Sequence, residues 1–138
     1  MRVIKPSARR SGAALVEAAI VVPVALFLLY VVFCGTIMVL TVNEVDTAAR
    51  EGARWASVRG WSYNFYTKKP SATADDIATY TKTQRVTIDD ARMTVNVSWD
   101  GSNRAGNYVI VEVRYQWDGL GPFPAQEIVA KSVELVTY

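Results

Sequence analysis

The chain has 138 residues, of which 51% are hydrophobic, and a formal net charge of +2. It has no histidine and a single cysteine, Cys34, so no His/Cys metal site and no intrachain disulfide can be predicted. Four of its 15 basic residues lie among the first ten, which leaves 11 basic against 13 acidic residues in the remainder. Because a nucleic-acid-binding domain needs its basic surplus in the folded part, this distribution argues against a nucleic-acid partner.

A long apolar run follows the basic start. Residues 18–42 are 25 consecutive residues without a charge, rich in Val, Leu, Ile and Phe. At about 1.5 Å per helical residue they extend roughly 37 Å, enough to cross a hydrocarbon core of about 30 Å. A secretory signal has an apolar stretch of only about 7–15 residues. The run therefore predicts a helix that spans a lipid bilayer.

The charges on the N-terminal side of this run predict the topology. By the positive-inside rule, unopposed basic residues place the N-terminus in the cytoplasm and the rest of the chain on the other side of the membrane. We therefore expect a cytoplasmic basic leader over residues 1–12 and the transmembrane half of a helix over residues 13–42. The basic residues are Arg2, Lys5, Arg9 and Arg10.

The helix is expected to continue beyond the membrane surface as an amphipathic segment over residues 43–60, with Gly60 as its stop signal. Small or apolar residues recur there at spacings of four, three and four, which is one stripe of a helix. A stripe of Ala and Gly lets another backbone approach closely. The stripe can pack on another subunit, on the chain's own sheet domain, or on each along different parts. Its members are Val45, Ala49, Gly52 and Ala56.

Residues 61–138 predict a small extracytoplasmic domain. Residues 61–70 mix aromatic residues, Asn, Lys and Pro, which is typical of a connection over the surface. Thr73 followed three residues later by Asp76 resembles a capping box, and it predicts a short helix over residues 73–82.

The remainder of this domain predicts a sheet. Apolar residues alternate with polar ones over residues 93–99 and 109–117, the period of half-buried strands, and Asp-Gly-Ser-Asn at 100–103 is a turn signal. We expect a helical turn over residues 124–130 and a third strand over residues 131–138. The predicted fold class is α+β, with a long N-terminal helix, a short helix and an antiparallel sheet of about three strands.

No catalytic, cofactor or metal site is predicted. The paired acids at 75–76 and 89–90 stand beside cap and turn signals, and no Gly-rich phosphate loop is present. Without histidine, a positioned base would have to be a carboxylate or a lysine. The sequence therefore favours a structural protein over an enzyme. Four tryptophans are expected to lie between helix and sheet rather than on a surface for a sugar or partner: Trp55, Trp61, Trp99 and Trp117.

Two blocks of the N-terminal helix resemble a known family. Residues 10–17 read Arg-Ser-Gly-Ala-Ala-Leu-Val-Glu, which resembles the prepilin-type cleavage signal of the type IV filament superfamily. With Pro23 and the stretch Ala-Ala-Arg-Glu-Gly-Ala-Arg at 48–54, the helix resembles the TadE-like pseudopilins of tight-adherence (Flp, type IVb) pilus systems. At position 18, where the family often has Phe or Tyr, this chain has Ala18.

The resemblance implies processing by a prepilin peptidase. The enzyme would read the basic leader with Arg9 and Arg10 and cut between Gly12 and Ala13, which makes Glu17 the fifth residue of the mature chain. A cut there creates an α-ammonium group, with a reference pKa of about 7.7–8.0, at the i,i+4 distance from the Glu17 carboxylate. Glu17 of the same or of an adjacent subunit is expected to neutralise this amine, and a pair between subunits would set their axial register.

Pro23 removes one backbone hydrogen bond and disfavours the turn before it, so bending or melting is expected near residues 19–23. The resemblance as a whole implies a minor pseudopilin of the bacterial inner membrane that acts in pilus initiation and adhesion. Its partners would be the peptidase, other pilin subunits, the inner-membrane assembly platform and the lipid bilayer. Two alternatives stay open: a single-pass protein whose periplasmic domain binds a ligand or partner, and a type II secretion pseudopilin.

Overall fold

The first element of the computed structural model is one helix, α1, from Arg9 to Ser57. The structure describes residues 9–83 and 88–137, and the side chains of residues 12–83 and 88–137. Residues 1–8 of the expected leader, and the side chains of Arg9 and Arg10, lie outside this description. α1 begins four residues earlier than the predicted start at residue 13, and it ends at Ser57, three residues before the predicted stop signal, Gly60.

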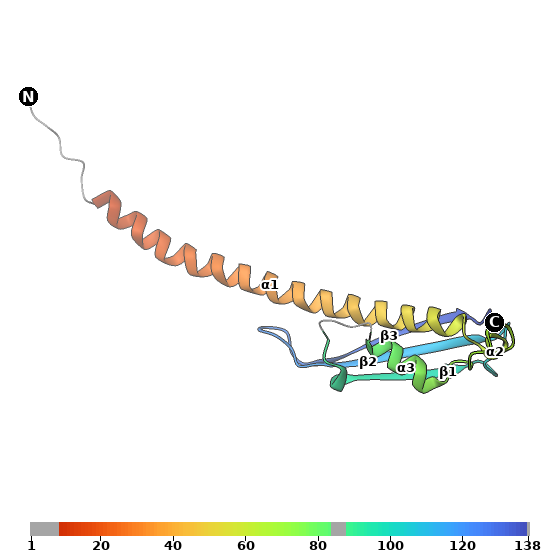
Figure 1. Ribbon diagram of the computed structural model, residues 1–138. Helices are drawn as coiled ribbons and strands as arrows, with labels where there is room; N and C mark the ends of the chain where they lie inside the picture. Colours follow the sequence, from red (N-terminus) through yellow and green to blue (C-terminus); the bar gives the residue numbers. More distant parts are fainter. Residues whose placement is uncertain (1–8, 84–87, 138) are drawn as a thin grey trace, which may run out of the picture.

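A three-stranded antiparallel sheet follows in the order β1-β2-β3. The strands are β1 (Met93–Trp99), β2 (Tyr108–Trp117) and β3 (Gln126–Leu135), and a 3-10 turn, η1 (Asp90–Arg92), leads into β1. Figure 1 shows α1 lying along the sheet with its C-terminal half, while its N-terminal half projects beyond it. The predicted α+β class, with one long helix before a small antiparallel sheet, is confirmed.

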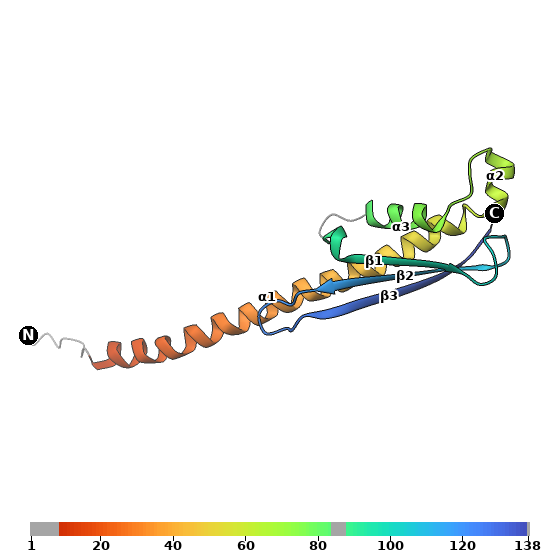
Figure 2. The same ribbon diagram turned by 90° about the horizontal axis from the view of Figure 1, so that it is seen from below.

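The core lies between the sheet and the helices. The residues of β2 that face α1 are almost fully covered, because the alternation of the strand turns every second side chain to the same side. α3 (Ala74–Thr83) lies against β1 and beside α1, as Figure 2 shows. The core residues of the sheet include Val109, Val111, Val113, Tyr115 and Trp117.

The cap of α3 forms as the sequence predicts. The backbone N–H and the hydroxyl of Thr73 both donate to the Asp76 carboxylate, at 3.0 and 2.7 Å, and the Asp76 N–H donates to the Thr73 hydroxyl at 3.2 Å. These bonds satisfy N–H groups that the start of a helix leaves without an intrahelical partner. The backbone bond from Thr73 and then the hydroxyl bond hold the pKa of Asp76 below its ordinary value.

One prediction about the domain is incomplete and one is wrong. The segment expected as a connection over the surface has no buried residue in its helix, but the sequence did not predict that helix, α2 (Trp61–Thr67), which ends at Lys68 in a left-handed conformation two residues before Pro70. The helical turn expected over residues 124–130 is instead the start of β3. β2 offers a complete ladder of backbone partners from Trp117 to Tyr108, and pairing with it satisfies more groups than an isolated turn would.

The end of α1 and the end of the chain are tied together. The Thr137 N–H donates to the Ser57 carbonyl at 2.9 Å, and the Trp61 N–H donates to the Asn103 carbonyl at 2.8 Å. The Asn103 side chain donates to the Ala72 carbonyl at 3.0 Å. These contacts close the end of the domain that lies farthest from the N-terminus (Figure 1).

Candidate functional site

The N-terminal half of α1 stands free of the domain. Every residue from 12 to 30 is exposed, and the apolar side chains among them have large exposed fractions, such as 71% for Leu15 and 66% for Leu29. The helix from Gly12 to Ser57 is long and apolar enough to cross a membrane; its most apolar window has a mean hydropathy of 2.6 and is only 6% buried. Exposed apolar surface of this size indicates a lipid or protein environment around the helix.

The predicted processing site lies within this free segment. The Gly12–Ala13 bond is in the first turn of α1, which begins at Arg9, and a Cβ at position 12 would meet nothing within 4 Å beyond the adjoining backbone of α1. Glu17 is exposed on the same helix, four residues beyond Ala13. The structure therefore brings the three residues onto one accessible stretch, away from the domain.

Pro23 does not interrupt α1, which is helical through residues 19–23. An interior proline removes one backbone hydrogen bond and its ring crowds the preceding turn, yet α1 continues across Pro23. No melted turn is present, and Figure 1 shows a gentle curve along the whole helix.

The predicted stripe packs on the chain's own domain. Val45 and Ala49 are fully buried, Ala56 is 1% exposed, and Gly52 is buried as well. A Cβ at Gly52 would stand 2.4 Å from the hydroxyl oxygen of Thr81 in α3 and 3.4 Å from Val111 in β2. Of the two contacts left open by the sequence, the intrachain one is present over all four residues.

The buried face of α1 is wider than the predicted stripe. Ala48 and Ala53 are also fully buried, since a helix on a sheet and a second helix presents more than one row of residues. The run of small residues in 48–56 could have indicated this wider buried face from the sequence. With this wider face α1 contacts β3 as well as β2.

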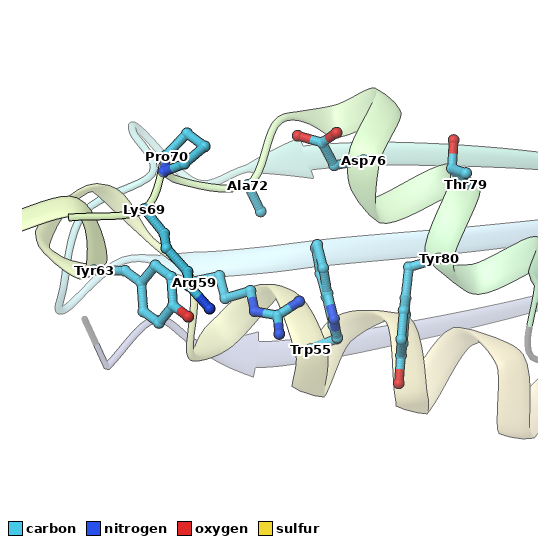
Figure 3. Close-up of a pocket in the computed structure, with 9 residues that line it drawn as sticks. All are labelled: Trp55, Arg59, Tyr63, Lys69, Pro70, Ala72, Asp76, Thr79 and Tyr80. Atoms are coloured by element: carbon cyan, nitrogen blue, oxygen red, sulfur yellow. The ribbon is translucent and has the colours of Figure 1, made fainter. Parts of the chain in front are cut away.

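A second surface feature, a hollow between the end of α1, α2 and α3, has a volume of about 530 Å³. Figure 3 shows four of its side chains standing in a row in which each covers the face of the next: Tyr63, Arg59, Trp55 and Tyr80. Trp55 stacks on Tyr80 with ring centroids 4.8 Å apart, and the Arg59 guanidinium lies 4.1 Å from the Trp55 centroid and 6.0 Å from that of Tyr63.

This row joins α1 to α2 and α3 by stacking and cation–π contacts. Because the Trp55 faces already have partners, the hollow offers no free tryptophan face on which a sugar ring could stack. Trp117 lies in the core, and Trp55 and Trp99 pack against it partly buried. Trp61 is 60% exposed, so the expectation that all four tryptophans lie between helix and sheet is wrong for Trp61.

The match to a known protein family lies within α1, the helix that carries the predicted processing site and the buried stripe. Residues 12–54 match the family of TadE-like proteins. The resemblance expected from the sequence is thereby confirmed for this segment. The TadE-like segment begins at the glycine of the predicted processing site and includes most of the buried face of α1, but it ends before α2, α3 and the sheet.

No curated protein and no solved structure matches the chain significantly. The TadE-like match associates the chain with Tad pilus systems, and the long apolar helix of this segment indicates a single membrane anchor. Within the residues that the structure describes, no group of three or more His, Cys, Asp and Glu side chains is placed to hold a metal ion.

Proposed function

We propose that the protein is a minor pseudopilin of a tight-adherence pilus, held in the bacterial inner membrane with its N-terminus in the cytoplasm until assembly. The observation that carries this proposal is the free helix over residues 12–30, which is apolar, exposed and part of the TadE-like match. Because the buried stripe lies in the C-terminal half of α1, residues 12–30 are the part of the helix that is exposed on all sides, where neighbouring helices can pack. A structural role follows from such a helix, since its surface supports packing rather than chemistry.

In this proposal a prepilin peptidase removes residues 1–12. The cut moves the start of α1 from Arg9 to Ala13. The free N–H groups and the positive end of the helix dipole then lie within about one turn of Glu17. The new ammonium group and the Glu17 carboxylate then form a pair. Between subunits the pair fixes the axial register, and it gains strength when both charges leave water with good geometry.

Protein sequencing tests the cleavage step. The chain is produced in cells with an active prepilin peptidase, extracted from the membrane and sequenced from its N-terminus. The expected first residue is Ala13, and Gly12→Val, which places a branched side chain at the scissile bond, is expected to keep residues 1–12. An intact leader in the wild-type chain beside a correctly processed pilin in the same cells would refute the proposal.

Pilus output tests the role of Glu17. Glu17→Gln keeps the size of the side chain and is expected to leave the chain in the membrane and to lower the amount of assembled pilus severalfold. Glu134→Gln, which neutralises an exposed carboxylate on β3, is the matched control and should assemble as the wild type does. Equal pilus output from Glu17→Gln and wild type would remove the register role.

A further inference from the structure

The connection between β2 and β3 folds back onto the apolar helix. Figures 1 and 2 show this connection as the part of the domain that reaches farthest towards the N-terminal half of α1. The Phe123 ring lies 3.5 Å from where a Cβ on Gly35 would stand, and a Cβ on Gly121 would stand 2.9 Å from the Cys34 sulfur and 2.8 Å from the Tyr30 hydroxyl. Cys34 is fully buried under this contact.

These helix positions lie inside the apolar run. A hydrocarbon core of about 30 Å takes roughly 20 helical residues, so a core that begins at Glu17 ends near Ile37. The contact with Tyr30 and Gly35 is then roughly 3–10 Å inside that boundary, at 1.5 Å per residue. Amphipathic segments that lie in a membrane interface reach a similar depth, about 5–10 Å.

The opposite face of α1 supports this depth. Val32, Phe33, Val39 and Leu40 are 57–66% exposed, so the apolar surface of the helix continues past the level of the connection. If the membrane ended before Tyr30, the uncharged residues between Glu17 and that boundary would be residues 18–29, only about 18 Å of helix. That length is too short for a hydrocarbon core of about 30 Å.

The composition of the connection suits this environment. Residues 119–125, Gly-Leu-Gly-Pro-Phe-Pro-Ala, contain no charge. Leu120 is 37% exposed, Pro122 and Pro124 are exposed, and Phe123 is half-buried against the helix. At the base of the connection Asp118 forms an ion pair with Arg92, which neutralises both charges where the interface begins.

Two backbone N–H groups of the connection are hydrogen-bonded within it, which lowers the cost of a medium with little water. Leu120 and Phe123 donate to each other's carbonyls at 3.1 Å, which closes the turn, and Pro122 between them has no N–H to satisfy. Gly121, at φ +60°, supplies the left-handed conformation that the turn requires and the close approach to Cys34. Unsatisfied backbone groups are what normally keep a loop out of the bilayer.

We propose that the β2–β3 connection, residues 119–125, inserts into the interface of the same bilayer that α1 crosses, on the side of the domain, as a second membrane contact. The partner is a lipid surface, and the inference rests on the membrane anchoring in the proposed function. With two contacts the sheet stands at a fixed angle to the bilayer, with α2 and the C-terminus at the far end.

Fluorescence quenching by spin-labelled lipids tests this insertion. The full chain with Cys34→Ala carries one new cysteine with an NBD label and is reconstituted at low protein density in phosphatidylcholine/phosphatidylglycerol vesicles. Leu120→Cys is expected to lose at least half of its fluorescence to a spin label placed near the headgroups. Pro124→Cys is a second position in case Leu120→Cys disturbs the turn, and Ala105→Cys, exposed in the turn between β1 and β2 at the far end, should be unaffected.

Leu26→Cys separates the two proposals, because this side chain is 60% exposed on the free part of α1 and is expected to be quenched best by a deep spin label. Quenching of the label at position 26, with none at positions 120 and 124, overturns the inserted connection and leaves the proposal that α1 anchors the chain in the membrane intact. No quenching at any of these positions overturns both. A third outcome is a blue shift of the NBD emission at position 120 that grows with protein density, without quenching by the lipid spin labels. It would mean that a second copy of the chain covers the connection, and it also overturns the inference.

Discussion

Replacing Gly52 by alanine probes how closely α1, α3 and β2 pack. The added Cβ would stand 2.4 Å from the Thr81 hydroxyl oxygen, about 1 Å short of an ordinary contact of 3.4 Å, whereas its 3.4 Å distance to Val111 is acceptable. Thr81 is fully buried and its hydroxyl donates to the Ile77 carbonyl at 2.7 Å, so it cannot turn away without losing that bond. The variant must therefore push α3 away from α1.

The expected magnitude combines two opposing contributions. Overpacking of a filled core costs about 1–3 kcal/mol, and alanine gains about 1 kcal/mol over glycine in a helix interior. Gly52→Ala should therefore lower the free energy of unfolding by up to about 2 kcal/mol, although helix propensity alone predicts a gain of about 1 kcal/mol.

The matched control is the same change in a Thr81→Ala background. Thr81→Ala alone removes a hydroxyl that is hydrogen-bonded and a methyl group, at a cost of about 1–2 kcal/mol. With that hydroxyl gone the Gly52→Ala methyl fits, and its effect should become neutral or stabilising by about 1 kcal/mol. The resulting coupling between the two sites is on the order of 1–3 kcal/mol.

The assay is urea unfolding of the full chain in detergent micelles, followed by tryptophan fluorescence, because Trp55, Trp99 and Trp117 pack in or against the core. The double-mutant cycle needs the four chains in the same detergent. Equal effects of Gly52→Ala in the two backgrounds, or a stabilised single variant, would refute the close packing of α1 against α3.

Three further predictions concern the domain and its contact with the helix. Asp76→Asn should lower the free energy of unfolding at pH 7 and make it less dependent on acid pH. The bonds from Thr73 lower the pKa of Asp76 in the folded chain. Its stabilisation is therefore present above the unfolded value of 3.8 and is lost as the pH falls through the folded pKa. Thermal unfolding between pH 2 and 7 measures this, and parallel curves for variant and wild type would contradict it. Ile77→Ala should cost about 2–5 kcal/mol in urea unfolding, and Ile77→Val only about 0.5–1.5 kcal/mol, because Ile77 is fully buried; equal costs would mean that the site collapses around the cavity. The Cys34 thiol should react with a maleimide only after denaturation, since it is fully buried beneath the β2–β3 connection, and rapid labelling of the native chain would show that the connection leaves the helix.

Local pattern was sufficient wherever a segment's own periodicity and caps decide its conformation. The period of two over residues 93–99 and 109–117 gave two strands within one residue of their observed bounds. The reciprocal bonds between Thr73 and Asp76 are a local device, which explains why the cap of α3 could be predicted from a spacing of three.

The errors concern segments whose conformation depends on a neighbouring element in the folded chain. Residues 126–130 lack a clean alternation, because the helix-facing side of β3 there includes Gln126, whose side chain donates to the Met38 sulfur, and the small Ala130. Their strand conformation comes from pairing with β2. α2 contains no buried residue, so it has no apolar stripe to predict it. Its first N–H donates to the carbonyl of Asn103, forty-two residues away, a contact that no local pattern predicts.

The sequence by itself determined the long apolar helix, its basic start, the TadE-like motif around Gly12 and Glu17 and the α+β class, because each depends on composition or on a spacing along one helix or strand. Only the tertiary structure decided what the stripe of Val45, Ala49, Gly52 and Ala56 touches, since one small-residue surface fits a neighbouring subunit and an intrachain sheet equally well. It also decided how much of the apolar run is not covered by the chain's own domain. The connection over residues 119–125 covers Cys34 from a position more than eighty residues along the chain, and such a contact follows from the packing of β2 and β3 on α1 and not from any local pattern.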